Sequence, residues 1–544
     1  MTSLLGGLNW IDAAIIVAYL ALLAGIGSYF SRKETSLDDF IRGGSKFGWL
    51  TLGMSLMAAL NSGMDYIQTP ALVYAIGMVF IMAWVSWIPL YPWIARVTVP
   101  FYQKLDVYSA YEYLELRFGM GVRTVGAGIF LLWRVGWMGA AIYAPCLAVN
   151  AATGGRMDVP LMVALLGLVV TFYTMLGGMK AVVWTDVAQF CIMFGGLAAT
   201  LWVVIGRIPG GVGELFQVAH ESGRLNLLGS VPEATGILGQ LRAFFTTEIT
   251  MLGMIAVVTL SRATAFTADQ IAIQRFQSAR SLPEARRSYV VNAVTDTVWM
   301  VFLGFVGLAL YAYAQHHPFP AGMQNDRVLP QFMLQHFPVG VTGLVIAAIF
   351  AASLSSVDSA LNSGASIVVV DFYNRFWLGR SRPVPNLPVA EQRRQVLVSR
   401  LATLALGLLM IVVGMNMQRM GEIYAATNKI LGAFFGPLFG IFFLGMFSRR
   451  AHSLGVLAGA LAGLGSSCFA SFFSTLPWLQ AGCGRLFGPA FVDFFRELSW
   501  LWPSPIGVVV TLGVGWLASL VLPSARNEPP LTFREVMRRP APGR

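Results

Sequence analysis

The sequence predicts an all-helical membrane protein with about thirteen transmembrane helices. Of the 544 residues, 56% are hydrophobic and only 12% are charged, whereas a soluble protein carries about a quarter charged residues. Apolar stretches of roughly 20 residues, the length that a helix needs to cross a bilayer, recur along the whole chain. The alternating pattern of barrel strands is not seen, and a helical bundle satisfies its backbone hydrogen bonds without water.

The apolar stretches define thirteen predicted spans. They cover residues 9–30, 47–69, 76–97, 124–152, 158–178, 181–205, 244–268, 292–314, 339–371, 401–417, 424–447, 453–473 and 504–522. The first is too long for the core of a cleavable signal peptide and has no basic flank, so we interpret it as a retained helix. We assign residues 1–522 to one transmembrane domain and expect the Pro- and Arg-rich segment 523–544 to be a disordered cytoplasmic tail.

The distribution of positive charge predicts the orientation. Of the 37 Lys and Arg residues, 26 belong to segments on one predicted side of the membrane, eight to segments on the other, and three lie within spans. Because cytoplasmic loops carry the excess of Lys and Arg, we expect the N-terminus outside and the C-terminus in the cytoplasm of a plasma (inner) membrane protein. Orientation therefore explains the formal net charge of +11 without a nucleic-acid partner.

Cysteines and histidines do not form a recognisable site in the sequence. The four cysteines show no metal-binding spacing, and a disulfide framework is not expected. The five histidines lie in loops or at the ends of spans, which argues against a histidine-based metal site in the membrane.

Two predicted spans are interrupted. The second contains Asn61-Ser62-Gly63 followed by Asp65, and the seventh ends in TADQIAIQR, with Asp269 behind the apolar run. Breaks in corresponding halves are typical of transporters built from inverted repeats with a site near the midplane. The segments 47–205 and 244–447 provide five spans each, so we predict a five-plus-five repeat with three extra helices, namely 9–30, 453–473 and 504–522.

The ninth span contains an unusual polar stretch, AASLSSVDSALNS at 351–363. On a helix its small and hydroxyl residues share one face beside Asp358. Small residues commonly allow close helix packing, but a carboxylate in a membrane span is costly without a partner. Hydroxyl, carbonyl and carboxylate oxygens are the ligands that hard cations prefer, so the stretch predicts a sodium site.

Five longer motifs occur in order along the chain. They are KLDVYSAYEYLELRFG (104–119), TMLGGMKAVVWTDVAQ (174–189), DQIAIQR (269–275), SLSSVDSALNS (353–363) and GPLFGIFFLGMFSRR (436–450). Together they resemble the sodium:solute symporter family, which includes sodium–glucose, proline, sialic acid, iodide, vitamin and monocarboxylate cotransporters. The resemblance extends from about residue 37 to 465, and AYEYLELRFG with IYAPCLAVN (142–150) most resembles the vitamin, monocarboxylate and iodide branch.

This resemblance implies a LeuT-type fold and sodium-coupled uptake of a small polar organic solute, with sodium as the coupling ion and no enzymatic activity. It also implies the sodium ligands by position. They are the main-chain carbonyls of Ala58, Asn61 and Ala352 and the hydroxyls of Ser355 and Ser356.

Some members of the family hold a second sodium ion slightly deeper in the protein. The matching positions in this chain are Asp186, Asp358 and Ser359. Asp358 stands where other members have Ser or Thr, so it adds a negative charge. Two nearby carboxylates without a cation raise the pKa of one of them, and we expect either a second cation site or protonation of Asp358 during part of the cycle.

The resemblance and the intramembrane charges also predict a solute site. Its candidate residues are Asp65, Gln68, Arg134, Trp137, Asp269, Asn428 and Lys429. Charges of both signs favour a carboxylate-bearing or zwitterionic solute, and a sugar or another neutral solute is the alternative. Asp65 with Arg134, or Asp269 with Lys429, are alternatively interpreted as structural ion pairs.

Rival functions outside transport by symport are an ion channel, a membrane sensor and an intramembrane protease. No channel filter motif and no GxGD or GxSG protease motif is found near the polar residues. The sequence does not specify an oligomeric state, and we expect a monomer to suffice for function.

Overall fold

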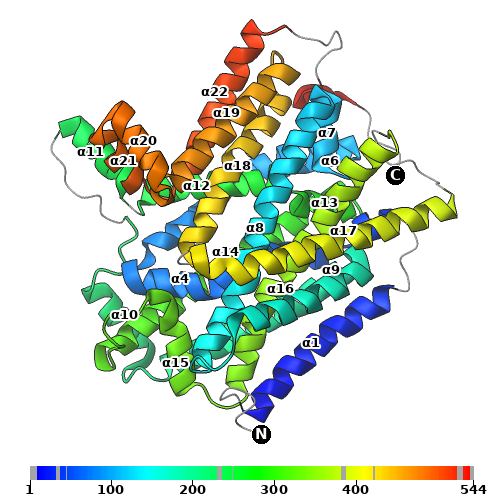
Figure 1. Cartoon of the computed structure of the whole chain (residues 1–544). Coiled ribbons are helices and arrows are strands. Elements are labelled where there is room, and N and C mark those ends of the chain that lie inside the picture. Colours follow the sequence, from blue (N-terminus) through cyan, green and yellow to red (C-terminus); the bar gives the residue numbers. More distant parts are fainter. Residues whose placement is uncertain are drawn as a thin grey trace.

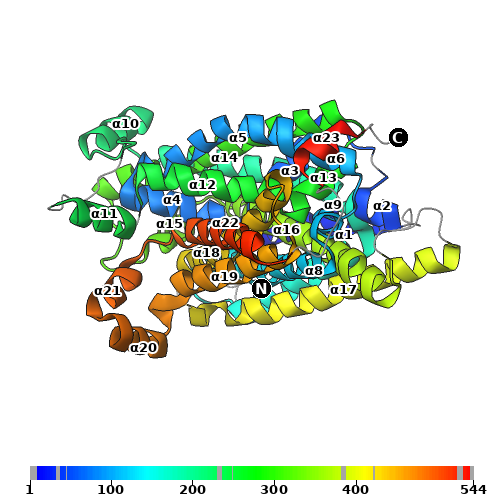
Figure 2. The same ribbon diagram turned by 90° about the horizontal axis from the view of Figure 1, so that it is seen from above.

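The computed structural model describes residues 9–31, 37–44, 46–228, 236–247, 249–380, 388–420, 423–523 and 531–539. Within these ranges the chain forms helices, joined by short turns, and a single isolated bridge between Phe47 and Ala279. Figure 1 and Figure 2 show the long helices packed side by side in one bundle. The prediction of an all-helical protein is confirmed.

The helices range from single turns to the 47 residues of α9. The first half of the chain contains α1 (Trp10–Ser31), α2 (Leu37–Arg42), α3 (Trp49–Leu60), α4 (Gly63–Ile76), η1 (Met78–Ser86), α5 (Trp87–Trp93), η2 (Ile94–Thr98), α6 (Val99–Leu105), α7 (Ala110–Phe118), α8 (Met120–Ala152), α9 (Val159–Ile205), α10 (Gly211–Glu221), α11 (Gly236–Thr246) and α12 (Met251–Thr267). The second half contains α13 (Gln270–Ser278), α14 (Leu282–His316), η3 (Asn325–Arg327), α15 (Val328–His336), α16 (Val341–Ile367), η4 (Val368–Trp377), α17 (Val389–Asn416), η5 (Met417–Met420), α18 (Ile423–Phe447), α19 (Ser453–Phe472), η6 (Phe473–Thr475), α20 (Pro477–Phe487), α21 (Pro489–Glu497), α22 (Pro503–Val521) and α23 (Phe533–Arg538).

Ten helices of the described chain are long and apolar enough to cross a membrane, or eleven if α11 and α12 form one bent span. The predicted count of thirteen is therefore not confirmed. Part of the difference is α9, which consists of two helical segments joined at a kink and covers both the fifth and the sixth predicted spans. It is kinked at Gly178, whose φ of 49° lies in the left-handed region that favours glycine. Another part is the second predicted span, which is divided between α3 and α4.

The break between α3 and α4 occurs where the sequence predicts it. Asn61 and Ser62 are extended, with φ/ψ of −106°/141° and −122°/167°. A capping box starts α4, because the Asp65 carboxylate accepts the Ser62 amide at 2.6 Å. A second predicted break is also present, since α12 ends at Thr267 and Asp269 caps the start of α13.

Helix α16 lies in the middle of the bundle. It contacts α1, α3, α4, α8, α9 and α17, and every residue from 345 to 367 is buried. Its many small side chains allow this close packing on all sides. The polar stretch of α16 therefore faces other helices rather than lipid, which is where an intramembrane carboxylate is tolerated.

The C-terminal segment departs from the prediction of a disordered tail. Residues 531–539 dock on the bundle, with Val536 of α23 fully buried. Lys104 at the end of α6 donates to the carbonyls of Met537 and Arg539 at 2.6 and 3.1 Å, and the Tyr113 hydroxyl donates to the Leu531 carbonyl at 3.2 Å. The prediction is wrong for this part, and the rest of the predicted tail after Pro523 lies outside the described residues.

The two ends of the bundle carry different connections. Figure 1 and Figure 2 show α10, α11, α20 and α21 gathered at one end, and α2 and the C-terminus toward the other. The predicted orientation of these ends relative to the cytoplasm, and the five-plus-five repeat with its boundaries, stay predictions.

Candidate functional site

Five oxygens converge where α16 faces the break between α3 and α4. The Ser355 hydroxyl donates to the carbonyls of Ala58 and Ala352 at 2.8 and 3.0 Å. The Ser356 hydroxyl donates to the Asn61 carbonyl at 2.5 Å, and lies 3.2 Å from the Ala352 carbonyl and 3.4 Å from that of Ala58. These are the atoms predicted as sodium ligands, and all five residues are buried.

The carbonyls of Ala58 in α3 and of Asn61 in the break face α16, because other hydrogen bonds engage the main-chain amides that would pair with them in a continuous helix. In an uninterrupted helix Ala58 would accept from the amide of Ser62, and Asn61 from that of Asp65. Instead the Ser62 amide donates to the Asp65 carboxylate, and the Asp65 amide donates to the Ser62 carbonyl at 3.0 Å. The capping box of α4 thus leaves the last carbonyls of α3 available to a cation.

A second polar cluster lies deeper in the bundle, between α3, α9, α13 and α16. Arg275 donates to the Asp186 carboxylate and to the Ser359 hydroxyl, both at 2.6 Å, and its Nε donates to the Ser55 hydroxyl at 2.8 Å. Ser55 in turn donates to Asp186 at 2.5 Å. Sequence reasoning missed the role of Arg275, although this residue ends the DQIAIQR motif.

Asp358 joins this cluster without a cationic side chain of its own. Its carboxylate accepts from the hydroxyls of Tyr173 at 2.9 Å, Thr185 at 3.3 Å and Ser359 at 3.3 Å. In the described part of the chain, Asp186 Oδ1 has no hydrogen-bond partner. Two buried carboxylates and one guanidinium leave the cluster one positive charge short of neutrality, which is costly inside a membrane.

A central cavity of about 300 Å³ opens beside the break, between α4, α8, α12, α14 and α18. Six of the seven predicted solute residues line it, namely Asp65, Gln68, Arg134, Trp137, Asp269 and Asn428. Lys429 is not among the described lining residues, so its predicted contact is not supported. The reason is geometric, because consecutive helical side chains point about 100° apart and Asn428 occupies the face toward the cavity.

The charges in the cavity wall pair differently from the two pairs considered from the sequence. Arg134 forms an ion pair with Asp269, and its guanidinium lies 3.8 Å from the ring centre of Trp133. Asp65 is occupied in the capping box of α4. The pairs Asp65–Arg134 and Asp269–Lys429 are therefore wrong, because Asp269 at the start of α13 reaches across to Arg134 on α8.

Another ion pair in the cavity wall was not predicted. Asp296 on α14 accepts from Arg262 on α12 at 2.8 Å, and both side chains line the cavity. The indole N–H groups of Trp84 and Trp87 donate to the same carboxylate at 2.8 and 3.1 Å. A lone carboxylate within the predicted span 292–314 was the available signal, the same signal that identified Asp358.

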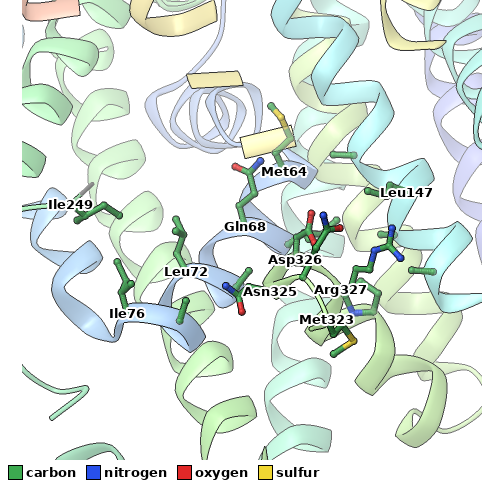
Figure 3. Close-up of a pocket in the computed structure, with 18 of the residues that line it drawn as sticks. Met64, Gln68, Leu72, Ile76, Leu147, Ile249, Met323, Asn325, Asp326 and Arg327 are labelled. Atoms are coloured by element: carbon green, nitrogen blue, oxygen red, sulfur yellow. The ribbon is translucent and has the colours of Figure 1, made fainter. Parts of the chain in front are cut away.

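A larger cavity of about 570 Å³ adjoins the central one and shares Met64, Gln68 and Leu72 with it. Figure 3 shows Leu72 and Ile76 of α4 on one side, with Asn325, Asp326 and Arg327 on η3 nearby. The residues that line the larger cavity place it between the central cavity and the segment that contains η3 and the start of α15.

A helical bundle with two broken helices, a hydroxyl-lined helix against one break and a solute-sized cavity beside it defines a secondary transporter. The chain belongs to the sodium:solute symporter family, whose model matches residues 40–463. The family prediction is confirmed, as are the LeuT-type fold, sodium as the coupling ion and the absence of enzymatic function among the relatives.

Two curated relatives show the breadth of the family. The chain is 30% identical over 478 residues to the sodium/sialic acid symporter SiaT of Proteus mirabilis (strain HI4320), covering 87% of this chain and 92% of the relative. It is also 30% identical over 556 residues to the sodium-coupled monocarboxylate transporter 1 of Homo sapiens, covering 94% and 86%.

Solved structures support the fold. A substrate-bound, outward-open structure of a Na⁺-coupled sialic acid symporter superposes with a TM-score of 0.80 at 26% identity, covering 96% of this chain and 100% of that one. The nucleobase-cation-symport-1 transporter Mhp1 superposes with a TM-score of 0.51 at 13% identity, covering 89% and 95%, which shows a shared fold alone.

Proposed function

We propose that the protein is a sodium-driven symporter that takes up a small carboxylate-bearing solute by alternating access. The observation that carries the proposal is the convergence of three main-chain carbonyls and two hydroxyls between the α3–α4 break and α16. These neutral oxygens suit a monovalent hard cation, and they belong to two elements that a bound ion would connect.

Sodium at this site would act as the driver of transport. The ion would bind to Ala58, Asn61, Ala352, Ser355 and Ser356, and so tie α3 and α4 to α16. Solute affinity would rise because sodium favours the state that presents the central cavity, a coupling free energy that works in both directions. The membrane potential contributes about 2.3 kcal/mol per charge for each 100 mV.

Unpartnered donors in the central cavity favour a solute rich in oxygen acceptors. Among the described residues, Gln68 Nε2, Trp133 Nε1, Arg134 Nε and Asn428 Nδ2 are buried without a hydrogen-bond partner, and all four residues line the cavity. Arg and Trp nitrogens can only donate. A solute carboxylate would receive a charge-assisted hydrogen bond from Arg134, whereas Asp65 or Asp269 would accept from a solute hydroxyl or amine.

The relatives agree with this solute class. The names of the two curated relatives refer to sialic acid and monocarboxylates, and both kinds of solute carry a carboxylate. A neutral sugar is not favoured, because it offers no charge to an arginine in the cavity wall. Trp137, which also lines the cavity, would contact the apolar face of the solute.

The deeper cluster supports a second cation site at Asp186, Asp358 and Ser359. Arg275 neutralises one of the two carboxylates, so one further monovalent cation, sodium or a proton, would complete the charge balance. Asp358→Asn removes the surplus charge and should lower the sodium Hill coefficient or abolish a pH dependence of uptake. An unchanged Hill coefficient together with an unchanged pH profile would exclude the second site.

We place the transporter in the plasma (inner) membrane, with the N-terminus outside and the tail with α23 in the cytoplasm. The excess of Lys and Arg on one predicted side supports this orientation. One chain contains all the residues assigned to the cation and solute sites, so a monomer would suffice. Labelling of single cysteines introduced at each end, in intact cells and in permeabilised cells, would test the orientation.

Transport itself is tested in proteoliposomes with an inward sodium gradient, and with potassium as the control cation. The solute panel holds pantothenate, lactate, proline, sialic acid, choline and glucose. We expect sodium-dependent, saturable uptake of a carboxylate, with counterflow, and its loss in Ser355→Ala. Ser366→Ala, on the same helix but bonded only within it, is the matched control. Sodium-independent uptake, or uptake without counterflow as in a channel, would contradict the proposal.

A further inference from the structure

The carboxylate of Asp296 accepts hydrogen bonds from four nitrogen donors in different parts of the chain. Oδ2 accepts from Arg262 Nη2 at 2.8 Å, Trp84 Nε1 at 2.8 Å and Trp87 Nε1 at 3.1 Å. Oδ1 accepts from Asn61 Nδ2 at 3.0 Å. Asp296 is 6% exposed, so these bonds form where water does not compete strongly.

Three of these donors are explained by burial of the charge. Arg262 supplies the opposite charge, and its guanidinium lies 4.8 and 4.2 Å from the ring centres of Trp84 and Trp87. It also donates to the Ser86 hydroxyl at 2.7 Å. The ion pair with Arg262 offsets the free-energy cost of a carboxylate inside the membrane. The fourth donor, Asn61, is therefore not needed to neutralise Asp296.

The fourth donor lies in the break between α3 and α4. Asn61 has an extended backbone, and its one main-chain link to either helix is the hydrogen bond that its N–H group donates to the Met57 carbonyl. Its side-chain nitrogen bridges the Met57 carbonyl and Asp296, both at 3.0 Å. The main-chain carbonyl of the same residue accepts from Ser356 at 2.5 Å. The side chain therefore anchors the residue whose carbonyl points toward α16.

We propose that Asp296 is a positioning residue of the sodium site. It holds the side-chain amide of Asn61, so that the main-chain carbonyl of Asn61 faces Ser356. The inference rests on the proposed sodium site. It adds a physical link between the sodium site and the solute site. Asp296 and Arg262 line the central cavity, whereas the main-chain carbonyl of Asn61 is one of the proposed sodium ligands. A solute that displaces Asp296 or Arg262 changes sodium affinity, and sodium changes solute affinity by the same factor.

The test is a sodium titration of the purified full-length protein without solute, at constant ionic strength with potassium as the replacing ion. Sodium-dependent thermal stabilisation reports the dissociation constant. We expect Asn61→Ala, which keeps the carbonyl, to weaken sodium binding by about tenfold or more, as for a lost hydrogen bond to a charged group. Asp296→Ala weakens it to a similar extent.

The double variant distinguishes positioning from a general loss of structure. If Asp296 acts through Asn61, the double variant Asn61→Ala/Asp296→Ala binds sodium with the same affinity as whichever single variant has the lower affinity. Effects that multiply would overturn the inference. Thr297→Ala is the matched control, because Thr297 follows Asp296 on α14 and its hydroxyl donates to the Ala293 carbonyl of the same helix at 2.7 Å, and it should retain the sodium affinity of the unmodified protein.

Two further variants keep the inference testable if Asp296→Ala does not fold, and they separate the positioning role from the sodium site itself. Asn61→Leu, like Asn61→Ala, leaves the Asp296–Arg262 pair intact, so wild-type sodium affinity in both would overturn the inference even if Asp296→Ala does not fold. Ser356→Ala removes a proposed sodium ligand. Normal sodium affinity in Ser356→Ala would refute the sodium site itself, whereas weakened binding there with normal binding in the Asn61 variants would refute only the positioning role.

Discussion

A single methyl group at Gly63 should disable the sodium site. Gly63 is the first residue of α4 and lies against α16. A Cβ atom added there would come within 2.4 Å of Ser353 Oγ and 2.6 Å of the Ile349 carbonyl oxygen. The serine can rotate away, but the carbonyl belongs to the backbone of the buried part of α16 and cannot.

The geometry sets the size of the effect. Relief of the carbonyl contact to the 3.4 Å at which Cβ contacts become ordinary requires α4 to move by roughly 0.8 Å, at an overpacking cost of about 1–3 kcal/mol. Metal–ligand distances tolerate only about 0.2 Å. The carbonyls of Ala58 and Asn61 would then no longer reach the same ion as Ser356, so we expect sodium affinity to fall by at least about tenfold.

The assay compares Gly63→Ala with Gly128→Ala, since a Cβ at Gly128 meets nothing within 4 Å. Sodium dependence of uptake in proteoliposomes gives the apparent affinity, and thermal melting in potassium reports the fold. Gly63→Ala should still melt cooperatively in potassium, below the control because of the overpacking cost, and should lose most of the stabilisation by sodium. Sodium affinity within twofold of the control, in a folded variant, would refute this account of how the site is built.

Other residues provide independent tests. In an Asp269→Asn background, Arg134→Gln removes the positive charge without leaving a carboxylate at position 269 unpaired, and it should raise the KM for a carboxylate solute by about tenfold or more. An unchanged KM would place the carboxylate elsewhere. Val536→Asp should lower the melting temperature by undocking α23, because the Val536 side chain is fully buried, whereas the exposed Arg534 tolerates alanine. Burial raises the pKa of Glu112 on α7 to about 7, so the folded state holds a proton to higher pH than the unfolded chain and loses stability as the pH rises from about 4.5 to 7. Glu112→Gln keeps the acceptor, and its melting temperature should depend less on pH, whereas equal slopes would contradict this reasoning.

The features that the sequence predicted well are local ones. Asn61-Ser62-Gly63 interrupts an apolar helix within three residues, and the hydroxyls of the 351–363 stretch share a face because of helical periodicity. Both signals need only neighbouring residues. The oxygens of the candidate sodium site therefore converge as the motifs imply.

The features that were missed depend on distant pairs. Arg275 meets Asp186 across 89 residues, and Asn61 meets Asp296 across 235, and no local pattern specifies such partners. An error of one position also matters on a helix, because it turns a side chain by about 100°. This is why Lys429 was assigned to a cavity that its neighbour lines.

The docked C-terminal segment has a consequence for the biosynthesis of the protein. Lys104 and its partner Met537 are 433 residues apart, so this contact cannot form until translation has passed α23. Until α23 has been synthesised, Lys104 lacks its two carbonyl acceptors, Met537 and Arg539, and Phe101 lacks its stacking contact with Phe533. A chain that stops before α23 lacks these contacts, so we expect it to be less stable than the full chain and more open to proteolysis.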